Sequence, residues 1–212
     1  MENIRIKFSK TGGAKYISHL DLNRFFQRMF KRSGIPVWYT VGFNPHIYLH
    51  FLLPLSLGTE SVSELVDLKL TEHMDYSEVK TRLHSVLPNG FEVLSVNEPK
   101  NKPTEIAKCC YEMLFEETDK DELLKFLGLS EIPVLKKTIR KEFTVDLKKE
   151  MEELKISETD GKPSIKVVLS SVETHMINPE LIVTAFSEFS GRDVFCRIKR
   201  TAVLSEDGST FE

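Results

Sequence analysis

The sequence predicts an α+β protein with mainly antiparallel sheets. Residues 4–10, 62–70 and 91–96 alternate apolar and polar side chains, which is typical of strands with one buried face. Residues 20–33 and 76–87 instead repeat apolar side chains at the three- and four-residue spacing of an amphipathic helix. With a short extended segment at 35–41, the first half reads strand, helix, strand, strand, helix, strand.

The same order recurs in the second half, beyond a polar segment at 97–104 that carries two prolines and resembles a linker. The predicted elements there are strands at 107–115, 138–147, 164–171 and 194–204, a helix beginning near Asp119 and a helix beginning near Asn178. A strand–helix–strand–strand–helix–strand order in each half predicts two tandem ferredoxin-like (βαββαβ) units, at 1–98 and 105–212.

The first helix has clear start and stop signals. Ser18 and Asp21 form a capping box, and Gly34 follows the last helical residue. His19 has no part in either signal, and it is therefore a candidate functional residue, close to the positive end of the helix dipole.

A second candidate histidine follows a turn. Asn44 and Pro45 both favour a turn, and His46 comes directly after them. We expect Phe43 to lie in the core and Asn44 to hydrogen-bond its own turn. We also predict that His19 and His46 face one cleft, although local packing roles would explain each histidine separately.

The composition is that of a globular protein, with 41% hydrophobic and 29% charged residues. No apolar run is long enough to cross a bilayer and no signal-peptide pattern is seen, so we expect a cytoplasmic protein without membrane contact. The three cysteines lack the spacing of a disulfide framework, a zinc site or an iron–sulfur site. We expect no metal and no cofactor, although His19, His46 and Asp21 could bind one metal ion if the fold brings them together.

Positive charge is concentrated near the start of the chain. Residues 1–50 contain eight Lys/Arg against Glu2 and Asp21, whereas the whole chain carries a net charge of −3. Four of these cations share one face of the helix at 20–33, which is either an ordinary solvated face or a surface for an anionic partner such as RNA. The four cations are Arg24, Arg28, Lys31 and Arg32. We predict that they contact phosphates together with Lys10.

Other parts of the sequence could extend such a surface. The stretches KKTIRK at 136–141 and CRIKR at 196–200 are basic. Aromatic side chains that could stack on bases are Tyr16, Trp38, Tyr39 and Tyr48, although Trp38 is equally suited to the core.

Three motifs together resemble a known family. FSKTGGAKYISHLDLNRFFQR, GIPVWYTVGFNPH and LPLSLGTES are similar to the bacterial radical-SAM-linked domain family. The resemblance implies a domain that works beside, or attached behind, a radical-SAM enzyme. After His46 this sequence departs from the family pattern, because it has Ile47 and Tyr48 where family members often have proline and arginine. The chain also lacks a closely spaced cysteine triad, so it is not itself predicted to be the radical enzyme.

These observations support three hypotheses, and they favour a non-enzymatic protein. The first is an RNA-binding or substrate-presenting accessory module for radical-SAM-type modification, with tRNA or rRNA as partner and with His19, Asn44 and His46 contacting a base, ribose or phosphate. The second is a metal-independent endoribonuclease, by analogy with other tandem ferredoxin-like proteins. The third is a protein-interaction domain that docks on a radical-SAM partner through the basic helix.

Overall fold

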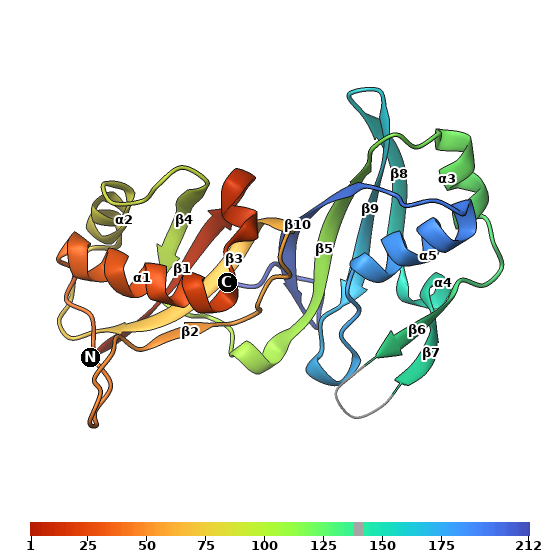
Figure 1. Ribbon diagram of the computed structural model, residues 1–212. Helices are drawn as coiled ribbons and strands as arrows, with labels where there is room; N and C mark the ends of the chain where they lie inside the picture. Colours follow the sequence, from red (N-terminus) through yellow and green to blue (C-terminus); the bar gives the residue numbers. More distant parts are fainter. Residues whose placement is uncertain (138–141) are drawn as a thin grey trace. The chain divides into compact units, whose positions relative to one another are not determined.

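The computed structural model describes residues 1–137 and 142–212 (Figure 1). The chain divides into two compact units, residues 1–105 together with 211–212, and residues 106–210. The described residues form ten strands and five α-helices, with mostly antiparallel strand pairing. The predicted α+β class is therefore confirmed. None of the helices in the described ranges is long and apolar enough to cross a membrane.

The first unit has the predicted element order. Its elements are β1 (Glu2–Lys10), α1 (His19–Ser33), β2 (Leu49–Phe51), β3 (Glu60–Leu70), α2 (Tyr76–His84) and β4 (Phe91–Asn97), with 3-10 turns at Gly12–Tyr16 and Pro103–Glu105. The strands pair antiparallel in the order β4-β1-β3-β2. The second strand lies at β2 rather than at 35–41, where Val37 and Tyr39 make only isolated bridges.

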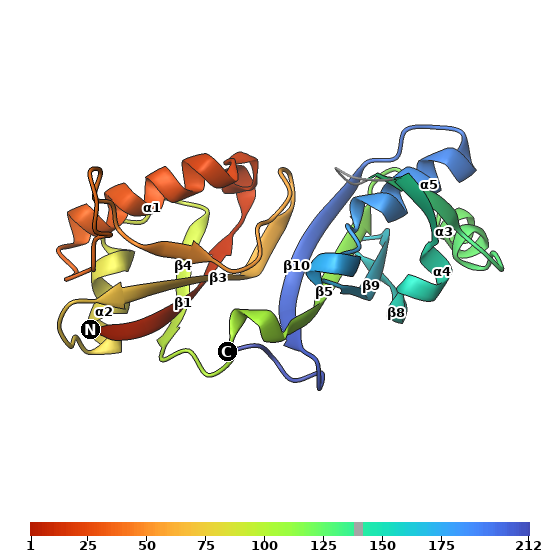
Figure 2. The same cartoon turned by 90° about the horizontal axis from the view of Figure 1, so that it is seen from below.

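One face of this sheet carries the core. Ile4, Ile6 and Phe8 alternate along β1 toward α1, which lies along that face (Figures 1 and 2). Phe26 of α1 packs among aromatic rings there, with its ring centroid 4.8 Å from that of Phe8 and 5.2 Å from that of Phe51. The apolar stripe of α1 is thus buried, and its polar side chains must point away from the sheet.

Phe43 corrects an expectation. We expected it in the core, but its side chain is fully exposed at the tip of the segment between Thr40 and His46. The backbone explains this position, because the Thr40 N–H donates to the His46 carbonyl at 2.8 Å and closes a hairpin with Phe43 at its turn.

The start and stop signals of the first helix behave as predicted. The Asp21 N–H donates to Ser18 Oγ at 3.1 Å, and Gly34 ends α1 in the left-handed region at φ 65°. Asp75 caps α2 by accepting from the Ser77 N–H, and this helix ends at His84, before the predicted end at residue 87.

The second unit contains a larger set of elements. They are β5 (Ile106–Phe115), α3 (Lys120–Leu127), β6 (Pro133–Lys137), β7 (Glu142–Asp146), α4 (Leu147–Glu150), β8 (Glu152–Thr159), β9 (Lys162–Ser170), α5 (Glu180–Ser190) and β10 (Cys196–Ser205), with a 3-10 turn at Glu173–His175. Its main sheet has the antiparallel order β10-β5-β9-β8.

One predicted strand of this unit forms, but it belongs to a separate small sheet. Of the predicted strand at 138–147, residues 138–141 lie outside the described residues. Residues 142–146 form β7, which pairs with β6 in a separate two-stranded sheet. The main sheet instead includes β8, which lies between the strands predicted at 138–147 and 164–171 and was not predicted as a strand. Because β8 is an edge strand with most side chains exposed, its sequence lacks the apolar alternation of a half-buried strand.

The buried aromatic cluster should dominate the stability of the first unit. Phe26→Ala removes a side chain that is 1% exposed, and we expect it to lower the free energy of unfolding by about 4 kcal/mol. Chemical denaturation followed by circular dichroism measures this change. Phe43→Ala is the matched control and should change the free energy by less than about 0.5 kcal/mol. Equal losses in the two variants would contradict this description of the core.

Candidate functional site

The outer face of α1 is a basic surface. Arg24, Arg28, Lys31 and Arg32 are all exposed, on the side of the helix opposite the buried stripe. Only Arg24 has an ion pair here, with Asp21 at 3.3 Å; in the part of the chain that the structure describes, no carboxylate lies within 4 Å of the other three cations. We call these four residues the basic face of α1.

Asp21 is the one carboxylate close to this surface. The hydrogen bond from Ser18 lowers the pKa of the Asp21 carboxyl, and the positive charges of Arg24 and Arg28 lower it further. Asp21 is therefore a stable anion that also completes the helix cap, with the Ser18 hydroxyl 2.7 Å from its carboxylate. One carboxylate does not balance four cations, so the basic face keeps a net positive charge.

Lys10 does not belong to this surface, contrary to the prediction. Its side chain is 2% exposed, and its Nζ donates to the Ile17 carbonyl at 2.8 Å. A buried ammonium that already satisfies a backbone carbonyl cannot present its charge to an RNA phosphate at the surface.

His19 is exposed at the first residue of α1. Its ring packs edge-on against Phe51 of β2, with 5.5 Å between the ring centroids. The side chain thus has an apolar neighbour as well as access to solvent.

His46 lies elsewhere, inside its own hairpin. Its Nδ1 is 3.1 Å from both Thr40 Oγ1 and the Asn44 carbonyl oxygen, which gives Asn44 the predicted turn role through its backbone. The hairpin is held to α1 by Gln27, whose amide donates to the Ile47 carbonyl at 2.7 Å and accepts from the Ile47 N–H at 3.0 Å.

These contacts separate the two imidazoles. Gln27 lies eight residues beyond His19, which is about 12 Å along the helix axis, and it is Gln27 that holds the residue next to His46. The expectation that His19 and His46 share one cleft is therefore wrong. The ribonuclease alternative, which needs one histidine as general base, stays a hypothesis. Within residues 1–137 and 142–212, no group of three or more His, Cys, Asp or Glu side chains could hold a metal ion.

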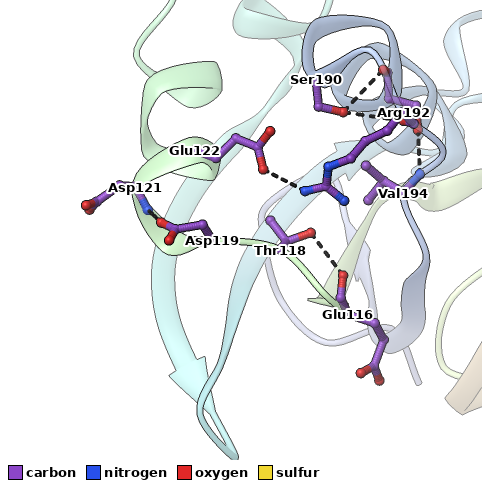
Figure 3. Close-up of polar contacts among 9 residues, drawn as sticks. Glu116, Thr118, Asp119, Asp121, Glu122, Ser190, Arg192 and Val194 are labelled. Atoms are coloured by element: carbon purple, nitrogen blue, oxygen red, sulfur yellow. Dashed lines mark hydrogen bonds and ion pairs between the residues drawn. The ribbon is translucent and has the colours of Figure 1, made fainter.

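Two of the predicted basic residues of the second unit are not exposed, unpaired cations. Arg200 is buried, and Arg197 pairs with Glu116 at 2.7 Å. The Glu116 carboxyl has a lowered pKa, chiefly because Lys162 hydrogen-bonds to it. Arg192 likewise points at Glu122 of α3, 2.7 Å away (Figure 3). The other predicted extension, at 136–141, falls largely outside the described residues.

A pocket in the first unit was not predicted from the sequence. It lies on the face of the sheet opposite the core, and its volume is about 430 Å³. Strand register brings its floor together, because Arg5 and His50 both lie opposite Asp67, and Asn3 lies opposite Lys69. We call it the open-face pocket; its lining residues are Asn3, Arg5, Tyr48, His50, Asp67, Leu68, Lys69, Pro99, Lys100, Asn101, Lys102 and Pro103.

Arg5 holds the wall of this pocket in place. Its guanidinium makes two hydrogen bonds to the Asp67 carboxylate, at 2.7 and 2.9 Å. It also donates to the Glu212 carbonyl at 2.7 Å and to the Asn101 carbonyl at 3.1 Å. The Phe211 ring lies against the guanidinium, 4.8 Å from its carbon atom to the ring centroid. One buried side chain thus ties the segment around Asn101 and residues 211–212 to the sheet.

Aromatic rings position a lysine at the edge of the pocket. Lys69 Nζ lies 5.3 Å from the Trp38 ring centroid and 5.4 Å from that of Tyr48, within the range of cation–π attraction. Trp38 is half-buried, and it meets Tyr48 edge-on at 6.0 Å. The other candidate aromatic residues, Tyr16 and Tyr39, are exposed.

Comparison with known proteins gives a family. The family model described as "Uncharacterized protein conserved in bacteria (DUF2344)" matches residues 3–179. The chain belongs to this family. No curated protein matches the DUF2344 chain. A solved structure described as an unknown protein from Galdieria sulphuraria is 11% identical over 94% of this chain and 98% of that chain. Its TM-score of 0.28 is too low for an argument about function.

Arg5 should be the most sensitive polar residue of this DUF2344 unit. Arg5→Met leaves the Asp67 carboxylate, which is 18% exposed, without its guanidinium, and we expect the free energy of unfolding to fall by about 3 kcal/mol. Urea denaturation measures the loss, and hydrogen exchange should show faster opening of residues 99–103. Lys7→Met, on the same strand, should change the free energy by less than about 0.5 kcal/mol. Similar losses in both variants would mean that Arg5 does not hold the wall.

Proposed function

We propose that this DUF2344 protein is a non-enzymatic module that binds RNA through the basic face of α1. The observation that carries the proposal is the row of four exposed cations opposed by one carboxylate, Asp21. Lysines and arginines four residues apart on a helix repel one another, and a polyanion relieves that repulsion. RNA phosphates are well matched to guanidinium groups, which bind them in a bidentate manner.

The spacing of the cations suits an extended ligand. Arg24, Arg28 and Arg32 follow one another at intervals of four residues, so they span about 12 Å along the helix. A single small anion would contact one or two of them. A strand of RNA, tRNA or rRNA for example, would contact all three and displace their counterions.

The histidines and Asn44 have a secondary place in this proposal. His19 is exposed at the start of the same helix, and His46 and Asn44 are exposed in the hairpin that Gln27 holds to α1. We propose that they contact the RNA as separate neighbours of the basic face.

We further propose a fold description and a setting for the module. The strand orders β4-β1-β3-β2 and β10-β5-β9-β8 support two tandem ferredoxin-like units, the second of which carries β6, β7 and α4 as an insertion. The motifs at residues 18–22 and 42–46 support a role beside a radical-SAM-type enzyme in the cytoplasm, because they resemble the radical-SAM-linked family.

Removing two cations should weaken RNA binding and its salt dependence together. In Arg28→Gln/Arg32→Gln, we expect the slope of log affinity against log salt concentration to become shallower by about 1.4, since each lost contact with single-stranded RNA contributes about 0.7. Fluorescence anisotropy with a labelled tRNA or rRNA fragment at several salt concentrations measures both quantities.

A matched variant separates this effect from a general loss of charge. Arg192→Gln/Arg197→Gln removes two arginines that Glu122 and Glu116 already neutralise, and RNA affinity should stay nearly unchanged. Binding that is independent of salt, or equally weakened by the two double variants, would refute the proposal. Retention of a radical-SAM enzyme without RNA would instead favour the protein-interaction alternative.

A further inference from the structure

The open-face pocket holds cations without nearby carboxylates. Arg5 is neutralised by Asp67, and Lys100 pairs with Glu212. Lys69 and Lys102 are different: in the described ranges, no carboxylate lies within 4 Å of either ammonium group. Since both oxygens of Asp67 are engaged by Arg5, the pocket offers two ammonium groups to an anion.

A titratable ring adjoins these cations. His50 is exposed on β2, opposite Asp67, and it lines the same pocket. Imidazole can donate a hydrogen bond to a phosphate oxygen whether the ring is neutral or protonated. Lys69, Lys102 and His50 together are therefore suited to a phosphate group.

The rest of the open-face pocket could contact a larger group attached to the phosphate. Tyr48, Pro99 and Pro103 contribute apolar surface, and Asn3 contributes an amide that can both donate and accept hydrogen bonds. A volume of about 430 Å³ lies in the range of small-molecule sites and exceeds the needs of a bare phosphate ion. A flat apolar group with polar edges, joined to a phosphate, fits this combination.

We infer that the open-face pocket binds one nucleotide, with its phosphate on Lys69, Lys102 and His50 and its base against the proline and tyrosine wall. The nucleotide is either a free mononucleotide or one unit of an RNA chain. This inference goes beyond the basic face of α1, because α1 packs on the core side of the sheet and the pocket lies on the other side.

Calorimetric titration of the full chain tests the pocket. UMP, AMP, GMP and CMP are the probes, with uridine and inorganic phosphate as partial ligands. We expect at least one mononucleotide to bind, and both partial ligands to bind at least about tenfold more weakly. Lys69→Met and Lys102→Met should each weaken the mononucleotide by about tenfold, because a charged hydrogen bond to phosphate is lost.

Controls keep the result specific. Lys31→Met makes the same substitution on the basic face of α1 and should leave mononucleotide affinity within about twofold. Lys102 is exposed and contacts no aromatic ring in the described residues, so Lys102→Met tests the charge even if Lys69→Met disturbs Trp38 and Tyr48. Thermal unfolding of each variant verifies that it is folded.

The outcomes are distinct from those of the RNA proposal. The inference is overturned if no mononucleotide binds, if inorganic phosphate binds as tightly as the mononucleotide that binds best, or if both pocket variants bind that mononucleotide normally. A ribotrinucleotide that binds at least about tenfold tighter than its mononucleotide identifies an RNA unit as the ligand, whereas equal affinity identifies a free nucleotide. Arg28→Gln/Arg32→Gln should lose RNA and keep the mononucleotide, so either proposal can fail alone.

Discussion

The ion pair between Arg5 and Asp67 is the interaction on which the first unit's polar face depends. The two residues are direct partners in the β1–β3 ladder, so the ion pair forms only when the two strands pair in this register. A buried guanidinium is tolerable only when its donors are satisfied, and Arg5 uses two on Asp67 and others on the carbonyls of Asn101 and Glu212. The same bonds that remove the cost of burial hold two distant segments of chain over the sheet.

Strand alternation then gives this sheet two different faces. On β1, Ile4 and Ile6 point to the core while Asn3 and Arg5 point to the pocket. Burial of the apolar side obliges α1 to pack there with its aromatic stripe inward, which turns its arginines to solvent. One period-two pattern thus generates both an outward basic helix face and an opposite polar pocket.

Much of this arrangement follows from local sequence. The cap at Ser18, the Gly34 terminus and the exposed face of α1 depend on residues close in the chain, and they were predicted correctly. The burial of Lys10 was not predicted, because it depends on a hydrogen bond to the Ile17 carbonyl, which lies beyond a turn. The open-face pocket requires knowledge of register and of the contacts of residues 99–103, which no single segment encodes. Alternation on β3 could still have placed Asp67 and Lys69 together on the polar face.

Among the described residues, both units contain cations that pair with carboxylates and cations that do not. In the second unit, Arg192 pairs with Glu122 and Arg197 pairs with Glu116, so these carboxylates neutralise both arginines within the protein. In the first, Arg28 and Arg32 on α1 and Lys69 in the pocket have no carboxylate within 4 Å among the described residues. The electric field of such cations attracts anions over about a Debye length. Both proposed anion sites rest on these local cations rather than on the net charge of the chain, which is −3.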